Sequence, residues 1–137
     1  MAVTFENGAM GSFESTRFAT GRKNSNLFEI HGDKGAVAFS LERMNELEFF
    51  DATLPAGEQG FRTILVTEAE HPYIAAWWPP GHVIGYEHTF THAVADFIRA
   101  VARKLPIHPD FDDGVRVIAV LEAAQRSAAA GKRLEVG

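Results

Sequence analysis

Two groups of polar side chains have the types and spacing needed to bind a small polar molecule. The first group consists of Arg17, Arg22, Lys23 and Asn24. Arginine and asparagine make directional hydrogen bonds, so this group suits a ligand that carries hydroxyl or carboxylate groups. The same residues also fit a solvated strand edge, whose charge discourages pairing with another chain. We predict that all four residues contact a substrate.

The second group contains His82, Tyr86 and His88, in the segment Pro-Gly-His-Val-Ile-Gly-Tyr-Glu-His. The proline and glycine before His82 favour a rigid loop, and loops on a rigid scaffold often carry binding sites. A histidine beside a hydroxyl group can donate, accept or shuttle a proton. The alternative is that these histidines cap or pack against the start of a helix. We predict that these three residues also bind substrate.

A metal site is a weaker alternative for the same region. His88 and His92 are four positions apart, which places both on one helix face at a spacing that metal ligands use. The zincin motif is absent because Glu87 precedes the first histidine. A third ligand would have to come from elsewhere, for example His82 or Asp96. We predict no metal site, and no catalytic residue within this chain.

Other familiar catalytic arrangements find little support. Asp110, Asp112 and Asp113 could pair for acid–base work, but their place just before an apolar periodic run favours helix capping. The chain has no cysteine and no Gly-x-Ser-x-Gly motif. A thiol nucleophile and the serine elbow of hydrolases are therefore excluded.

The elements that must position these residues change from strands to helices along the chain. Alternating apolar residues and tight turns such as Asn7-Gly8 predict strands. An apolar repeat of helical spacing predicts two helices, the second beginning at Asp112 or Asp113 and stopping at Gly131. The expected strands cover about residues 10–20, 27–31, 36–41, 46–51, 61–67 and 134–136, and the helices about residues 86–104 and 112–130, with an irregular segment at 68–85.

This order predicts an α+β fold. We expect residues 1–137 to form a single domain with an open, mainly antiparallel sheet. Helices should pack on one face of the sheet, and the other face should be available for oligomerisation or substrate.

Composition narrows the class of protein. The net charge of −5 argues against a nucleic-acid surface. No stretch is long and apolar enough to span a bilayer, and the first residues do not resemble a signal peptide. Together with the absence of cysteine, these features lead us to expect a cytoplasmic protein.

A series of short motifs resembles, in order and spacing, the C-terminal domain of the glucose–fructose oxidoreductase / inositol dehydrogenase (Gfo/Idh/MocA) family. Each motif is weakly specific alone, but the series covers nearly the whole chain. The matching pieces are Gly11–Arg17 with Ala19 and Gly21, Glu29-Ile30 with Gly32, Lys34-Gly35, Glu42, Asn45-Glu46-Leu47, Gly60-Phe61, Ile64, Trp78-Pro79-Pro80-Gly81, Phe111, Asp113-Gly114, Ser127-Ala128 and Gly131.

The resemblance implies a division of labour between two domains. Family members pair an N-terminal Rossmann domain, which binds NAD or NADP, with this C-terminal domain, whose open sheet supplies substrate contacts and packs subunits together. A Glu-Lys-Pro lysine and an Asp-x-x-x-His histidine commonly catalyse the reaction. This sequence contains neither motif, and it lacks the Gly-x-Gly-x-x-Gly nucleotide turn.

We therefore expect the substrate-binding and subunit-packing domain of an NAD(P)-dependent sugar or polyol oxidoreductase, inactive as this chain alone because hydride transfer needs a held cofactor. We expect a homo-oligomer that uses the open sheet face, with a separate Rossmann-domain polypeptide as a further possible partner. Trp77 and Trp78 could stack on a sugar or anchor a core. The alternative function is a self-sufficient small-molecule binding or regulatory module that kept a sugar pocket.

Overall fold

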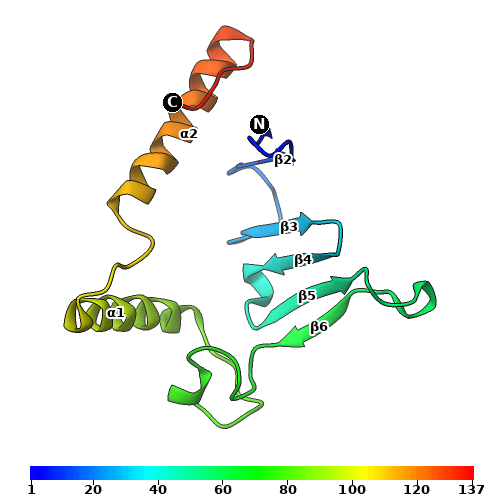
Figure 1. Ribbon diagram of the computed structural model, residues 1–137, viewed down its shortest axis with the longest axis vertical. Coiled ribbons are helices and arrows are strands. Elements are labelled where there is room, and N and C mark those ends of the chain that lie inside the picture. Colours follow the sequence, from blue (N-terminus) through cyan, green and yellow to red (C-terminus); the bar gives the residue numbers. More distant parts are fainter. The chain divides into compact units, whose positions relative to one another are not determined.

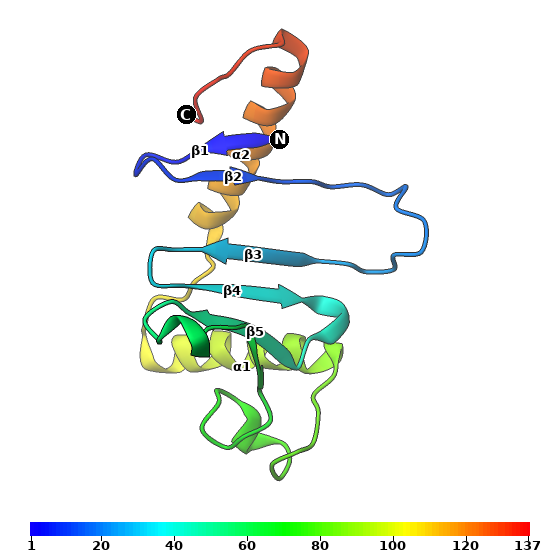
Figure 2. The same cartoon turned by 90° about the vertical axis from the view of Figure 1, so that its right-hand side faces the viewer.

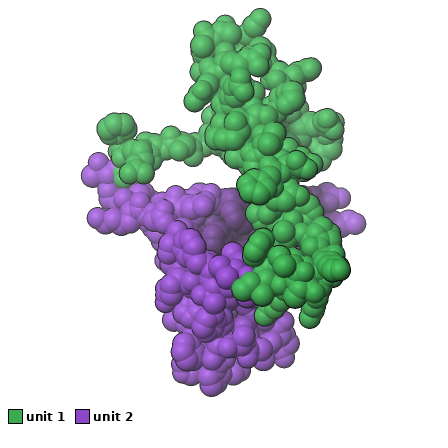
Figure 3. All heavy atoms as spheres, turned by 90° about the vertical axis from the view of Figure 1, so that its left-hand side faces the viewer, with its two compact units in different colours: residues 1–19, 97–137 green, residues 20–96 purple.

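The computed structural model describes residues 1–137 and divides them into two compact units (Figure 3). One unit comprises residues 1–19 and 97–137, and the other comprises residues 20–96. Two separate antiparallel sheets and two helices confirm the predicted α+β class (Figure 1). The elements are β1 (Ala2–Thr4), β2 (Met10–Ser12), β3 (Leu27–His31), β4 (Gly35–Ser40), β5 (Glu46–Asp51), β6 (Arg62–Leu65), α1 (Tyr86–Arg103) and α2 (Phe111–Ala130), with three short 3₁₀ turns, η1 (Leu41–Arg43), η2 (Ala56–Glu58) and η3 (Ile74–Ala76).

The larger sheet is a meander in which β3, β4, β5 and β6 pair in sequence order (Figure 1), and Figure 2 shows β3 and β4 side by side. Strands that are consecutive in the sequence pair with one another, and every pairing is antiparallel. The β4–β5 pairing is unusually close at one end. A Cβ atom placed on Gly35 would lie 2.4 Å from the carbonyl oxygen of Phe50, so no other residue fits at this position without a backbone shift.

The register gives the larger sheet one apolar face. Directly paired residues project to the same side, which unites Phe28 with Phe39, Ile30 with Val37, and Leu47 with Ile64. We call this surface the apolar face; Arg62, which pairs with Phe49, lies on the same side, and the apolar residues are Phe28, Ile30, Val37, Phe39, Leu47, Phe49 and Ile64. None of these side chains is buried within the chain. The opposite face, which we call the acidic face, is mixed. It carries the acidic side chains of Glu29, Glu46 and Glu48 beside apolar ones such as Leu27, Phe50 and Leu65.

The smaller sheet is the β1–β2 hairpin, and it confirms the Asn7-Gly8 turn. Gly8 has a φ of 86°, and the side chain of Asn7 accepts a hydrogen bond from the Ala9 amide at 3.0 Å. The predicted strand over residues 10–20 is wrong beyond Ser12. The ladder ends where the Phe13 amide bonds to the Met1 carbonyl, and residues 14–20 have no facing strand to satisfy their backbone groups.

Helix α2 begins one residue earlier than the sequence indicated. Asp110 is the N-cap, because its carboxylate accepts from the Asp113 amide and the Asp113 carboxylate accepts from the Asp110 amide, each at 3.0 Å. The cap prediction of Asp112 or Asp113 is therefore wrong, since Asp113 occupies the reciprocal position of this capping box. Gly131 ends the helix with a φ of 62°, as predicted.

The chain after α2 forms no strand, so the predicted strand over residues 134–136 is also wrong. Hydrogen bonds from the Ser127 hydroxyl to the Lys132 carbonyl and from the Lys132 amide to the Ser127 carbonyl turn the chain back on the helix end. Neither helix combines the length and apolar character needed to cross a membrane.

Helix α1 starts at Tyr86, as predicted, and presents an uncovered apolar stripe. The stripe residues are each between 57% and 63% exposed. They are Phe90, Val94, Phe97, Ile98 and Val101. An amphipathic helix with so much bare apolar surface is typical of an element that packs against a further body.

The segment between β6 and α1 is irregular, as predicted, but it is well anchored. Ile74, in η3, is only 2% exposed, and Thr67 is buried as well. The Gly81 amide bonds to the Thr67 carbonyl at 3.3 Å, which brings the two ends of the segment together. Tyr73 has a φ of 69°, a conformation that non-glycine residues adopt at a cost in free energy.

Candidate functional site

The candidate site is an open depression at the start of α1. Residues 79–85, which we call the entry loop, lead into the helix, and the depression has a volume of about 490 Å³. Its lining residues are Trp78, His82, Val83, Ile84, Gly85, Glu87 and His88. Two of the three residues predicted in this region, His82 and His88, thus border one space, and Tyr86 lies between them in sequence at the first position of α1.

The depression combines apolar surface with a few polar groups. Trp78 is 47% exposed and offers a flat apolar surface. His82 Nδ1 lies 3.0 Å from the Pro79 carbonyl, which orients its ring within the loop. Tyr86 is exposed and its ring packs edge-on against Phe90, with 5.2 Å between ring centroids. A mixed surface of this kind can pack against the C–H groups of a ligand while its polar atoms bind hydroxyl groups.

A group of stacked rings supports the histidine side of the depression; we call Tyr73, Trp77, His88 and His92 the aromatic cluster. Trp77 donates from its indole nitrogen to His92 Nε2 at 2.7 Å, and the Tyr73 ring stacks on His92 at 4.3 Å. The Tyr73 hydroxyl donates to Asp96 at 2.6 Å. Trp77 also meets His88 edge-on at 4.3 Å. Trp77 thus serves as an internal anchor, whereas Trp78 lines the depression.

Hydrogen bonds to protein donors already occupy one nitrogen on each helical histidine. The Gly85 amide donates to His88 Nδ1 at 2.9 Å, and the Trp77 indole donates to His92 Nε2. A metal ion would need these rings to offer a free nitrogen in a common direction. The observed bonds instead give both histidines a role in holding neighbouring backbone and side chains.

The predicted cationic group is arranged differently from the histidine group. Arg22 forms an ion pair with Glu42 at 3.3 Å, and the Lys23 amide bonds to the same carboxylate. Neither Asn24 nor these two residues line the depression. Arg17 belongs to the other compact unit. Their contact with a substrate remains a prediction.

The acidic face of the larger sheet holds a second, smaller hollow of about 210 Å³ between β3, β4 and β5. Arg43 lines it and pairs with Glu46, and it also approaches Glu48. The Thr63 hydroxyl donates to Glu48 at 2.7 Å. These charges are satisfied by one another, which is typical of a solvated sheet surface.

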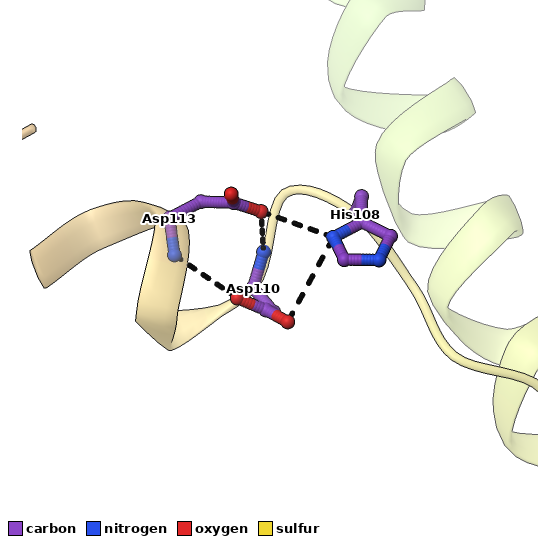
Figure 4. A group of neighbouring side chains, drawn as sticks. All are labelled: His108, Asp110 and Asp113. Carbon is purple, nitrogen blue, oxygen red and sulfur yellow. Dashed lines mark hydrogen bonds and ion pairs between the residues drawn. The ribbon is translucent and has the colours of Figure 1, made fainter. Parts of the chain in front are cut away.

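His108, Asp110 and Asp113 form a third polar group, with ligand-type atoms all within 4.8 Å of one another (Figure 4). The capping box of α2 accounts for its geometry. The Asp110 amide and the His108 ring hold the pKa of the Asp113 carboxyl below its usual value. His108 and Asp110 are exposed and Asp113 is half-buried. The role of the group is to start a helix, as the sequence predicted for these aspartates.

The topology of the chain does not suit a dinucleotide. Nicotinamide cofactors bind where a glycine-rich turn joins a strand to a helix within a parallel βαβ unit. Every strand pairing in residues 1–137 is antiparallel, and the strands join one another directly rather than through helices.

The tie that holds the entry loop was missed in the sequence. The side chain of Asn45, just before β5, bonds to both backbone groups of Ile84. A contact across 39 positions leaves no periodic or motif signal. The match of Asn45-Glu46-Leu47 to a family pattern drew attention to Asn45 but did not indicate that it bonds to Ile84.

Comparison with known proteins shows similarity along nearly the whole chain. The family model described as the C-terminal alpha/beta domain of an oxidoreductase family matches residues 1–136. The chain is 42% identical over 128 residues to levoglucosan dehydrogenase of Pseudarthrobacter phenanthrenivorans, an alignment that covers 93% of this chain and 33% of that protein.

Solved structures show the same relationship. An oxidoreductase domain protein from Kribbella flavida superimposes with a TM-score of 0.97 and 51% identity, over 99% of this chain and 35% of that one. Levoglucosan dehydrogenase in complex with NADH and levoglucosan superimposes with a TM-score of 0.92 and 40% identity, over 98% of this chain and 37% of that one. The chain spans about a third of the length of these relatives.

Proposed function

The chain belongs to the Gfo/Idh/MocA oxidoreductase family, as its C-terminal α/β domain, and from that premise we propose that it is the substrate-binding and subunit-packing part of an NAD(P)-dependent sugar or polyol oxidoreductase. The single observation that carries this proposal is the depression at the start of α1, where His82 and His88 border one space beside Trp78. The substrate class follows from the chemistry of these residues and from the relatives named for levoglucosan.

Hydroxyl recognition needs donors and acceptors at fixed positions beside an apolar surface. Tyr86 offers a phenol, and the two histidines offer ring nitrogens. Trp78 offers a face for the C–H groups of a sugar ring. Arg17, Arg22, Lys23 and Asn24 are proposed as further contacts to the polar rim of the substrate.

The proposal assigns this chain no catalytic turnover of its own. Hydride transfer requires a nicotinamide held against the substrate carbon, and the antiparallel topology does not suit that cofactor. We expect NAD or NADP to be held by residues outside this chain, on the same or a separate polypeptide. The relative in complex with NADH is about three times as long, which is consistent with this division.

The apolar face is proposed as the surface that packs subunits together. It presents seven apolar side chains across four neighbouring strands, and none of them is buried within the chain. An apolar surface of this extent, with no fully buried side chain, is rare on a monomer. We expect a second copy of the chain to cover it, as a closed symmetric pair.

The proposed function is tested by calorimetric titration of the purified chain, with and without NADH. The sugars are levoglucosan and L-sorbose, which are both found bound in solved structures of levoglucosan dehydrogenase. Tyr86→Phe removes one hydroxyl and should weaken binding about tenfold, the equivalent of about 1.4 kcal/mol. His82→Ala should also weaken binding. His31→Ala is its matched control, because His31 is an exposed histidine of β3 that lies outside the depression. If neither sugar binds, or if all variants bind equally, the proposed site is wrong.

A self-sufficient binding or regulatory module is the second candidate function. It is favoured by the fact that residues 78–88 of this chain form the depression by themselves. Thermal-shift measurements against polyols and sugar acids separate the two functions. Stabilisation by a sugar that stays the same when the nucleotide-binding part and NADH are added supports the module, whereas stabilisation that increases when they are added supports the enzyme domain.

A further inference from the structure

The entry loop is tied to the larger sheet by one side chain. Asn45 lies between η1 and β5, and its backbone carbonyl accepts a hydrogen bond from the Val66 amide at 3.0 Å. This bond extends the β5–β6 ladder by one rung and fixes the position of the Asn45 backbone. The side chain of Asn45 is therefore projected from a rigid point of the sheet.

The Asn45 side chain acts as a peptide group does in a neighbouring strand. Its amide nitrogen donates to the Ile84 carbonyl at 2.8 Å, and its amide oxygen accepts from the Ile84 amide at 3.0 Å. Both bonds are partly buried, so water competes poorly for them. An asparagine has the length and the paired donor and acceptor needed for this arrangement.

His88 completes the arrangement on the next residue. The Gly85 amide donates to His88 Nδ1 at 2.9 Å, and the His88 amide donates to the Gly85 carbonyl at 3.1 Å. All four backbone polar groups of Ile84 and Gly85 are thus satisfied by two residues. We call these four bonds the Ile84–Gly85 clamp.

The clamp also sets the tautomer of His88. A backbone amide can only donate, so Nδ1 must accept and the ring proton must lie on Nε2. The side chain of His88 is 13% exposed, and the edge of the Trp77 ring system restrains its plane. The carboxylate of Glu87 lies 3.5 Å from His88 Nδ1.

We propose that Asn45 is a positioning residue of the sugar or polyol site, which holds the Ile84–Gly85 backbone so that His88 presents an Nε2–H donor to the ligand and Tyr86 starts the helix at a fixed place. The inference rests on the function proposed above and adds to it a residue that does not line the depression. Asn45 acts through the clamp and not by touching the ligand.

The test compares Asn45→Ala and Asn45→Asp with the unaltered chain. Asn45→Asp keeps the shape and one acceptor but places a carboxylate oxygen against the Ile84 carbonyl, so it should be as harmful as alanine. Asn26→Ala is the matched control, because Asn26 is an exposed asparagine of the same unit whose recorded hydrogen bonds use its backbone.

Two readouts report the clamp directly. Amide hydrogen exchange of Ile84 should accelerate at least about tenfold in both Asn45 variants and stay unchanged in Asn26→Ala. Imidazole nitrogen NMR should show His88 protonated on Nε2 in the unaltered chain and a mixture of tautomers in the variants. If exchange at Ile84 and the His88 tautomer are the same in all four proteins, the clamp is refuted.

A third readout joins the clamp to binding. Calorimetry with levoglucosan should show affinity about tenfold weaker in both Asn45 variants, with no change in Asn26→Ala. If the unaltered chain binds and Asn45→Ala binds equally well, the positioning role is wrong while the proposed function stands. If the unaltered chain binds neither levoglucosan nor L-sorbose, the proposed function fails and the positioning role fails with it.

Discussion

Truncation of Ile74 should destabilise the segment that carries the candidate site. Ile74 is the most completely buried large side chain, at 2% exposure, and it lies in η3 between β6 and the entry loop. Ile74→Ala removes three carbon atoms, worth about 2.4 kcal/mol at about 0.8 kcal/mol per buried methylene. The cavity left behind adds to this loss, so we expect about 3 kcal/mol, within the usual range for such changes.

Urea unfolding followed by tryptophan fluorescence measures this effect. Both tryptophans, Trp77 and Trp78, lie within four residues of Ile74 and within the unit of residues 20–96, so the signal reports on the correct part of the chain. Ile118→Ala is the control, because Ile118 on α2 is 62% exposed and its truncation should cost under about 0.5 kcal/mol. A loss below about 1 kcal/mol for Ile74→Ala, or equal losses for both variants, would refute the reasoning.

Four further outcomes are expected. Trp77→Phe leaves His92 Nε2 without its donor and should cost about 1 kcal/mol of stability in urea unfolding, read from the remaining tryptophan. The Asp110 amide lowers the pKa of Asp113, so the stability that this carboxylate gives α2 is complete above the ordinary value of 3.8 and is lost as the pH falls through the lowered pKa. Circular dichroism should therefore show the helical signal falling more steeply below pH 3.8 in the unaltered chain than in Asp113→Ala. Phe39→Glu places a charge within the apolar face and should convert the proposed oligomer to monomer in light scattering, a prediction that fails if the unaltered chain is monomeric at all concentrations. Gly131→Ala forces a Cβ into a φ of 62° and should cost about 1 kcal/mol in thermal unfolding.

Local patterns predicted the elements that have a partner nearby in the sequence. The strands at Leu27–His31 and Glu46–Asp51 were predicted with their observed bounds, because each alternates in side-chain character and pairs with a strand only a few residues away. Residues 14–20 alternate in the same way but face no strand. Alternating apolar and polar side chains show which face a strand would bury, whereas hydrogen bonds to a neighbouring strand decide whether the strand forms.

Helix ends were predicted less well than helix cores. Three aspartates near the start of α2 could each cap it. A capping box needs a second carboxylate three residues after the N-cap, so that each side chain bonds to the backbone amide of the other residue. Asp110 and Asp113 satisfy that spacing, but Phe111, which lies between them, is apolar and was not read as the first helical position. The full exposure of Phe111 shows that an apolar residue at a helix end need not be part of its packed stripe.

The sequence indicated which polar residues of the candidate site lie near one another, but not which residues hold them in place. His82, Tyr86 and His88 share a short segment, so their proximity follows from sequence distance alone. Asn45 is joined to that segment through the fold, and no local pattern predicts such a bond. The aromatic cluster shows the same limitation, because the pairing of Trp77 with His92 depends on how the irregular segment returns to α1.

Gly35 lies so close to the Phe50 carbonyl that one added methyl group would change which surface the larger sheet presents to other molecules. An alanine there would meet the Phe50 carbonyl and push β4 and β5 apart or along one another. A slip of one residue along the strand exchanges its two sides. After such a slip, Val37 and Phe49 would no longer lie together and acidic groups would interrupt the apolar face. Saturation mutagenesis at this position, selected for assembly, should return the parental residue alone.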